Sequence, residues 1–406
     1  MGRRHAIRHI NQSSHHSIMI TPASRLDNIK EYYFARKLRE IAEMRRAGAD
    51  IISLGVGGPD LPPPAEVTAT MAREVMNPSN HGYQPHSGIA ELREAFARWY
   101  ARQYGVTLLP DSEVLPLIGS KEGVTHISLA FLNPGDKVLV PNPGYPTYTS
   151  ITRLIGAEPV YYHLSEENGW QPDFDLLEDS DLTGVKMMWL NYPHMPTGAK
   201  ACRETFVKAV DFARRHDILL VHDNPYSLIL NPEPMSIMEI PGAMDTAIEL
   251  NSLSKSHNMP GWRVGVAVSN PQFISWIMKV KSNVDSGQFK PLMLAAAKAL
   301  QEGPEWSARL NEAYARRRRI AERIMTALGC TFDPTQSGLF LWGRIADPAT
   351  DPEQLADRVL AEANVFITPG FIFGSAGDRY IRLSLCATEQ QLEEALRRIT
   401  LITSAK

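Results

Sequence analysis

The stretch from Asn251 to Gly265 concentrates residues that could do chemistry together. Lys255 lies among serines just after an apolar run, and Arg263 follows eight residues later. Serine hydroxyls and a guanidinium fork suit a phosphate group, and a lysine amine can form a Schiff base with an aldehyde. Pyridoxal 5′-phosphate (PLP) carries both groups, so the stretch indicates a PLP site. An ordinary exposed loop lysine would give the same local pattern, and the rest of the chain must decide.

The elements that would position this lysine alternate between strand and helix. Apolar runs typical of strands occur at 114–118, 138–140, 159–163, 185–190, 218–221 and 264–268, and helical spacing at 27–47, 65–76, 89–104 and 205–215. The prolines and glycine of 143–148 predict a loop with an exposed aromatic residue. This alternation predicts an α/β domain with a mostly parallel sheet. Ligands of such sheets bind at the carboxyl ends of strands. Gly119, Asn191, Asp223 and Lys255 all fall at or just past such ends, which predicts one shared site.

Two glycine-bearing loops could approach a ligand. Gly119 follows a strand and precedes a helix, and the free amides and dipole of a helix N-terminus favour a phosphate. As a bare motif this turn is weak. The loop 55–60 allows either a plain turn or close backbone approach to a ligand, because glycine permits both.

The C-terminal part predicts a second, smaller α+β domain. We expect helices at 304–328, 351–363 and 389–401, and strands at 338–345, 365–368 and 380–385. The run 316–319 is four arginines inside the first helix, where successive residues point about 100° apart, so we expect a solvated face and no nucleic-acid contact. The predicted division is 1–18 as a disordered extension, 19–61 as an N-terminal arm and part of the small domain, 62–300 as the large PLP-binding domain and 301–406 as the small domain.

Composition excludes several classes. Of the 406 residues, 44% are hydrophobic and 21% charged, as in ordinary globular proteins, and the net charge of −3 argues against binding to nucleic acid or a membrane surface. The three cysteines have no metal-ligand spacing, which predicts free thiols in a reducing cytoplasm and no metal site. The longest apolar runs fall short of the roughly 18 residues needed to span a bilayer.

With these residues in view, the chain from about Ile29 to its C-terminus resembles the class I/II aminotransferases, which are fold-type-I PLP enzymes. The stretch around Lys255 is similar to the family's Ser-x-x-Lys…Arg signature. The resemblance implies that Lys255 forms the internal aldimine and moves the proton between Cα and C4′. It also implies a fold with a large domain built on a mostly parallel seven-stranded sheet, plus a smaller α+β domain.

The same resemblance assigns the cofactor contacts. Ser252 and Arg263, with Ser120 and Lys121 of the turn after Gly119, would hold the phosphate. Asp223 and Tyr226 match an Asp-x-x-Tyr pattern, in which the carboxylate pairs with the pyridinium nitrogen and the phenol meets the ring hydroxyl. Tyr145 matches the aromatic residue that stacks on the ring.

Substrate and partner contacts follow from the resemblance as well. Arg382 matches the arginine that binds the substrate α-carboxylate, Gly57 matches a loop glycine beside that carboxylate, and Asn191 is a further expected substrate contact. Tyr83 matches a tyrosine that reaches the phosphate of a neighbouring subunit, which implies a homodimer with shared sites.

One position departs from the family. The usual Asn-Pro-Thr-Gly is Met195-Pro196-Thr197-Gly198 here, so Met195 stands where an amide would face the ring hydroxyl. A thioether cannot donate such a hydrogen bond, which puts the electronic tuning of the ring in question but leaves cofactor binding intact.

The stretches 31–34, 119–123 and 282–287 are most similar to the LL-diaminopimelate aminotransferase branch. The resemblance implies ping-pong transfer of an amino group between an L-amino acid and a 2-oxo acid, with glutamate and 2-oxoglutarate as one pair. A PLP-dependent C–S lyase or decarboxylase would share every cofactor residue. A ligand-sensing regulator would need a DNA-binding domain, for which residues 1–18 are too few.

Overall fold

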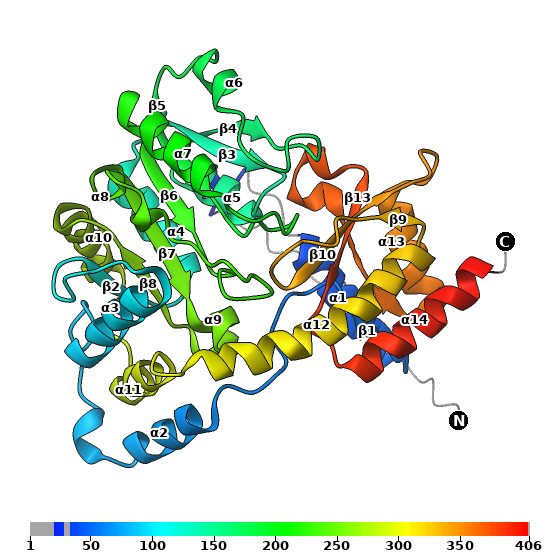
Figure 1. The fold of residues 1–406 in the computed structure, drawn as a ribbon, viewed down its shortest axis with the longest axis horizontal. Coiled ribbons are helices and arrows are strands. Elements are labelled where there is room, and N and C mark those ends of the chain that lie inside the picture. The colour runs from blue at the N-terminus through cyan, green and yellow to red at the C-terminus, as the bar shows by residue number, and fades with distance from the viewer. Residues whose placement is uncertain (1–19, 28–32, 405–406) are drawn as a thin grey trace, which may run out of the picture.

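The computed structural model describes residues 20–27 and 33–404, and it contains two sheet-based parts (Figure 1). The predicted extension 1–18 lies outside the described residues. The helix expected over 27–47 is described from Tyr33 and ends at Arg46 as α1. The long helix α12 (Pro304–Ala327) extends from beneath α9 (Leu253–Ser256) of the larger part to the smaller part in Figure 1.

The larger part contains a seven-stranded sheet with the strand order β2-β8-β7-β6-β5-β3-β4. Only β8 is antiparallel to its neighbours, so the predicted mostly parallel seven-stranded sheet is confirmed. In that order the strands are β2 (Val114–Leu117), β8 (Gly265–Val268), β7 (Ala247–Ser252), β6 (Leu219–Asp223), β5 (Val185–Leu190), β3 (Lys137–Asn142) and β4 (Glu158–His163).

Both faces of this sheet are apolar because helices cover both. Leu219 and Val221 of β6 enter one apolar cluster and Leu220 enters the other, as the alternation of side chains along a strand requires. The first cluster includes side chains of α4 (Ser120–Phe131), α5 (Pro146–Leu154) and α10 (Pro271–Val284). The second includes side chains of α3 (Ala90–Tyr104) and α7 (Arg203–Arg215).

The smaller part has a four-stranded sheet and a two-stranded one. The four-stranded sheet has the order β12-β13-β10-β9, and β1 pairs with β11 in parallel. Their bounds are β1 (Ile52–Ser53), β9 (Cys330–Thr331), β10 (Phe340–Ile345), β11 (Val365–Phe366), β12 (Thr368–Pro369) and β13 (Tyr380–Ser384). Helices α13 (Pro352–Ala363) and α14 (Glu389–Ser404) lie beside these sheets with α1 and α12 (Figure 1).

Shorter helices complete the fold. They are α2 (Ala65–Val75), α6 (Phe174–Glu178), α8 (Ala243–Thr246), α9 (Leu253–Ser256) and α11 (Lys290–Ala299).

The domain boundaries at 61 and 300 stay predictions. Within the part of the chain that the structure describes, no helix combines the length and the apolar character needed to cross a bilayer. Cys202, Cys330 and Cys386 are free thiols.

Two sequence-based expectations about elements are wrong. The segment 365–368 is not one strand, because β11 pairs with β1 in one sheet while β12 pairs with β13 in another. The loop expected over 143–148 ends at Tyr145, where α5 begins. A proline fits the first position of a helix because its missing N–H would have no partner there, so Pro146 conceals this start. Tyr148 is fully buried and not an exposed loop residue.

The arginine run 316–319 is not simply a solvated face. Arg316 and Arg319 are exposed, but Arg317 is only 4% exposed. Its Nη1 and Nη2 atoms donate to the two carboxylate oxygens of Asp60 at 2.6 and 2.8 Å, and Nη1 also reaches the carbonyl of Leu385 at 3.1 Å. A bidentate pair of this kind is the geometry that arginine favours with carboxylates. Arg317 therefore connects α12 to the loop that follows the glycines at 55–58.

Candidate active site

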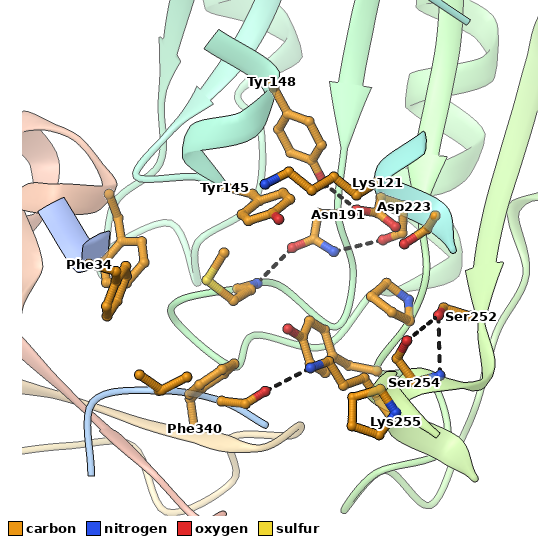
Figure 2. A pocket seen from close by; sticks show the side chains of 18 of the residues that line it. Phe34, Lys121, Tyr145, Tyr148, Asn191, Asp223, Ser252, Ser254, Lys255 and Phe340 are labelled. Atoms are coloured by element: carbon orange, nitrogen blue, oxygen red, sulfur yellow. Dashed lines mark hydrogen bonds between the residues drawn. The ribbon is translucent and has the colours of Figure 1, made fainter. Parts of the chain in front are cut away.

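A cavity of about 650 Å³ lies where the carboxyl ends of the parallel strands face the smaller part (Figure 2). Its walls come from both parts and from α1, since Phe34, Phe340 and Asp223 all line it. Twelve of the thirteen predicted site residues are among its lining residues: Gly57, Ser120, Lys121, Tyr145, Asn191, Met195, Asp223, Tyr226, Ser252, Lys255, Arg263 and Arg382. Tyr83 does not line the cavity and is 96% exposed.

Lys255 reaches this cavity from α9, a single short helix directly after β7. Ser252 caps the helix by accepting the N–H of Ser254 at 3.2 Å. The Nζ atom of Lys255 donates to the carbonyl of Gly57 at 2.7 Å. Burial lowers the pKa of the Lys255 amine, and the charges of Arg382 and Arg263 lower it further. A lowered pKa increases the fraction of neutral amine, which is the nucleophilic and proton-accepting form.

The loop glycine beside Lys255 leaves room that a side chain would fill. A Cβ atom on Gly57 would lie 2.1 Å from Cζ of Phe340. The backbone of Gly57 can therefore approach both Phe340 and the lysine, which is the close-approach reading of the loop 55–60.

Asp223 lies at the carboxyl end of β6 and faces the same cavity (Figure 2). Its Oδ2 atom accepts the hydroxyl of Tyr148 at 2.8 Å, and that ring stacks on Trp189 with centroids 4.6 Å apart. Its Oδ1 atom is buried and has no hydrogen-bond partner among the described residues. Burial raises the pKa of Asp223 from 3.8 to about 6. A buried acceptor without a partner is costly unless a donor meets it, so this oxygen is suited to a cationic N–H group in the cavity.

One end of the cavity combines a helix N-terminus with serines and an arginine. Ser120 and Lys121 begin α4, and Gly119 before them has φ +78°. A Cβ atom on Gly119 would lie 2.2 Å from Nη2 of Arg263, so glycine allows the guanidinium to pack against the turn. The hydroxyls of Ser252 and Ser254 are 2.9 Å apart beside them. These donors converge as a phosphate group requires.

Arg382 projects from β13 and is only 4% exposed. Its Nη2 atom donates to the carbonyl of Gly55 at 2.8 Å, and its Nη1 atom lies 3.2 Å from the sulfur of Met195. The guanidinium lies over the ring of Phe340, with 3.8 Å between Cζ and the ring centroid. This packing holds the planar fork in the cavity in an orientation suited to a carboxylate.

Met195 and Asn191 make different kinds of contact in the cavity. Met195 is buried, and its side chain faces Arg382. The Asn191 side chain donates to the carbonyl of Asp223 at 2.6 Å and accepts the N–H of Met195 at 2.8 Å. Asn191 therefore fixes the backbone behind Asp223, and its expected contact with substrate stays a prediction.

The two predicted aromatic contacts flank the cavity. Tyr145 is partly buried and lies edge-on to Tyr148, with centroids 5.4 Å apart. Tyr226 lies edge-on to Phe340 at 5.9 Å, and burial raises the pKa of its hydroxyl. Both rings line the cavity in positions that could contact a planar ligand.

Sequence reasoning misses two residues of this site. Tyr148 falls in an expected loop, and only the start of α5 at Pro146 could show that it turns inward. Ser254 belongs to the serine-rich stretch but receives no role of its own from the sequence, although it lines the cavity and lies 3.4 Å from Nη1 of Arg263.

The donor set fits PLP. An anion site, a lysine amine and a buried carboxylate oxygen without a partner among the described residues match the phosphate, aldehyde and pyridinium nitrogen of that molecule. The cavity also holds Arg382, which could bind a second carboxylate.

Comparison with known proteins agrees with this geometry. A family model described as aminotransferase class I and II matches residues 49–399. The chain belongs to the class I and II aminotransferases. The LL-diaminopimelate aminotransferase of Oleidesulfovibrio alaskensis is 42% identical over 382 residues, covering 93% of this chain and 98% of that protein. The protein of the same name from Moorella thermoacetica is 40% identical over 379 residues, covering 93% and 97%.

Solved structures of this aminotransferase family have the same fold. Apo-BacF from Bacillus subtilis aligns with a TM-score of 0.90 at 37% identity, covering 95% of this chain and 99% of that one. The aspartate aminotransferase of Thermus thermophilus with maleate aligns with a TM-score of 0.87 at 29% identity, covering 95% and 100%. The predicted fold, aminotransferase activity and PLP cofactor are thereby confirmed.

We expect the Asp223→Asn substitution to stabilise the cofactor-free aminotransferase at pH values above 6. The folded state binds more protons than the unfolded state between pH 3.8 and about 6, because burial raises the pKa of this carboxyl. The folded and unfolded pKa values of this carboxyl differ by about two units, which destabilises the folded state by about 3 kcal/mol above pH 6. This cost decreases as the pH falls toward 4.

Thermal unfolding of the cofactor-free protein at pH 5 and pH 8 measures this effect. The variant should gain more over wild type at pH 8 than at pH 5. Asp211→Asn, at an exposed position on α7, is the control and should show no such difference. An Asp223→Asn effect of the same size at both pH values would contradict the prediction.

A second prediction concerns Met195. An amide donor facing the ring hydroxyl favours its anionic form, so Met195→Asn should lower the pH at which the visible absorbance of the bound cofactor changes. Wild type should keep the protonated, yellow form to a higher pH. Spectral titrations of wild type and variant measure the difference, with the exposed Met76→Asn as control. Equal midpoints, or a lower midpoint in wild type, would show that the site does not lack a hydrogen-bond donor because of Met195.

Proposed function

We propose that this aminotransferase exchanges an amino group between an L-amino acid and a 2-oxo acid in a ping-pong reaction, with glutamate and 2-oxoglutarate as one pair. The observation that carries the proposal is the convergence of Lys255, Asp223 and Arg382 in one cavity. The relatives named LL-diaminopimelate aminotransferase make LL-diaminopimelate a candidate for the other amino acid.

In this proposal the chain binds the cofactor at three points. Ser120, Lys121, Ser252 and Arg263 bind the phosphate, with Ser254 beside them. Asp223 would accept the N–H of the ring nitrogen through Oδ1, which has no partner among the described residues. Tyr145 would stack on the ring, and Tyr226 would meet the ring hydroxyl. The cofactor supplies an electron sink that acidifies the substrate Cα–H bond.

The remaining residues act on the substrate. Arg382 binds the α-carboxylate through its planar fork, with Gly57 beside it, and so orients the amino acid. The amine of Lys255 would anchor the cofactor through a Schiff base. Once the substrate amino group has displaced it, the free amine would accept the Cα proton, for which its lowered pKa prepares it. Phe340 packs on Arg382 and excludes water from one side of its guanidinium.

Lys255→Ala should reduce turnover by several orders of magnitude, since one side chain anchors the cofactor and moves the proton. Lys208→Ala, an exposed lysine on α7, should leave the rate unchanged. Borohydride treatment of wild type should label Lys255. Labelling of another lysine would refute the assignment.

The reaction type is tested in the same preparation. Mixing wild type with glutamate alone should release one 2-oxoglutarate per site and then stop until a second oxo acid is added. A panel that includes LL-diaminopimelate then identifies the partner substrate. Steady release of ammonia and pyruvate from cysteine-type substrates, without that single turnover, would favour a C–S lyase.

We further propose a homodimer in which Tyr83 contacts the phosphate bound by the partner subunit. Tyr83 is 96% exposed, and Phe289, 40% exposed, contacts the neighbouring His81 with ring centroids 5.7 Å apart. Exposed aromatic residues grouped in this way are typical of a surface that another chain covers. The cytoplasm stays the predicted location, supported by three cysteines that form no disulfide.

Light scattering should show a dimer under assay conditions, and Tyr83→Phe should weaken cofactor binding without changing the assembly. The hydroxyl is the only group lost, so the expected effect is a few-fold to about tenfold decrease in affinity. An active monomer would contradict the shared site.

A further inference from the structure

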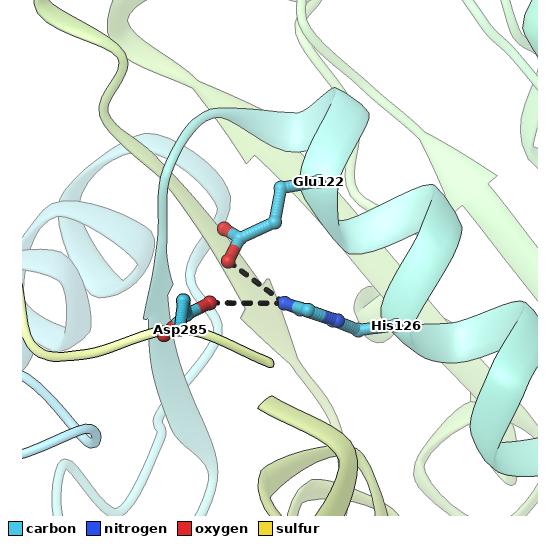
Figure 3. A group of neighbouring side chains, drawn as sticks. All are labelled: Glu122, His126 and Asp285. Atoms are coloured by element: carbon cyan, nitrogen blue, oxygen red, sulfur yellow. Dashed lines mark hydrogen bonds and ion pairs between the residues drawn. The ribbon is translucent and has the colours of Figure 1, made fainter. Parts of the chain in front are cut away.

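Behind the anion-binding turn lies a buried group of four ionisable side chains. Glu122 and His126 are on α4, and Asp285 directly follows α10 (Figure 3). Lys281 is in the last turn of α10. His126 and Lys281 are only 1% and 2% exposed, and the two carboxylates 15% each. None of the four lines the cavity, so the chemistry of the site does not use them directly.

The group is fully interconnected through the two carboxylates. Nε2 of His126 lies 2.8 Å from Oε1 of Glu122 and 3.1 Å from Oδ2 of Asp285. Nζ of Lys281 donates to both oxygens of Asp285 at 2.8 and 2.9 Å, and to Oε1 of Glu122 at 3.2 Å. Buried networks of charge-assisted hydrogen bonds hold their members in one geometry.

A metal centre is a weaker explanation of the same residues. One ligand atom from each of Glu122, His126 and Asp285 lies within 4.8 Å of the others. Lys281 already places its ammonium between the carboxylates. It supplies the positive charge that a metal ion would bring, so the geometry favours an ion network.

Glu122 connects this network to the turn that faces the cavity. Its second oxygen, Oε2, accepts the backbone N–H of Ile118, the residue before Gly119. A glutamate at the third position of a helix that bonds back to the preceding backbone stabilises the helix start. Its negative charge in the first turn also suits the helix dipole. Glu122 thus fixes the direction in which Ser120 and Lys121 present their N–H groups.

Asp285 connects the network to the other side of the anion site. The segment that follows it packs against the loop of Tyr83, since a Cβ atom on Gly287 would lie 2.3 Å from the carbonyl oxygen of Gln84. One residue later, Nε2 of Gln288 donates to the carbonyl of Arg263 at 2.8 Å. The network therefore bonds the α4 turn, and the chain that continues from Asp285 contacts the Tyr83 loop and the backbone of Arg263.

We propose that Glu122, His126, Lys281 and Asp285 form a positioning network that sets the affinity of the site for the phosphate group of the cofactor and not for its ring. This inference rests on the proposed phosphate site. The four residues act through Ser120, Lys121 and Arg263, which would touch the phosphate.

The test compares binding of PLP and of pyridoxal, which lacks the phosphate, to the cofactor-free protein. Glu122→Ala should weaken PLP binding roughly tenfold or more, as expected for loss of a hydrogen bond to a charged group, while pyridoxal affinity changes less than about threefold. Glu122→Gln keeps an acceptor for Ile118 and should recover part of the loss. Glu94→Ala, an exposed residue on α3, is the matched control and should change neither affinity.

The other outcomes separate this inference from the proposed cofactor site. Equal loss of both affinities, or an unchanged ratio of PLP to pyridoxal affinity, would overturn the inference. Asp285→Asn preserves side-chain size and should lower the same ratio, so it carries the test if Glu122→Ala does not fold. Failure of the wild type to bind PLP would instead refute the proposed cofactor site.

Discussion

The rest of the site depends on a buried carboxylate, one oxygen of which has no hydrogen-bond partner among the described residues. Asp223 has a pKa raised to about 6 by burial, so an ionised carboxylate there is costly in the folded protein without its cofactor. The fold holds it nonetheless. Tyr148 donates to one oxygen, its ring is stacked on Trp189, and Asn191 bonds the backbone carbonyl. A cationic donor in the cavity would relieve the remaining cost, which couples cofactor binding to stability.

The second constraint is that the site is shared between distant parts of the chain. Lys255 lies on α9, directly after strand β7 of the large sheet, and its amine donates to the carbonyl of Gly57. Arg382, on strand β13 of the smaller part, donates to the carbonyl of Gly55. Asp60, a few residues further on, receives Arg317 of the long helix α12. The segment 55–60 thus connects Lys255, Arg382 and the long helix α12. A small shift of this segment would move both Lys255 and Arg382, so its glycines constrain the site as much as its charged residues do.

Much of the site is predictable from the sequence because parallel strands end at one edge of a sheet. Asn191, Asp223 and Lys255 each follow an apolar run, and all three line one cavity, together with Ser120 directly after Gly119. Tyr148 is not predictable in this way, because its role depends on α5 turning it under the sheet edge. The same holds for Arg317. Helical geometry predicts that the four arginines at 316–319 point in different directions. It does not predict which of them contacts Asp60, 257 residues away in the sequence.

Met195 shows how a local departure can alter a site while its framework stays intact. The Asn191 side chain bonds the backbone of both Asp223 and Met195, so the loop that carries Met195 keeps its path without a second amide. Met195 then presents a sulfur to Nη1 of Arg382 at 3.2 Å. A thioether is a weak acceptor, whereas the carbonyl of Gly55 holds the other terminal nitrogen at 2.8 Å. The two terminal nitrogens of Arg382 therefore have acceptors of unequal strength, while the aromatic packing preserves the plane of the fork.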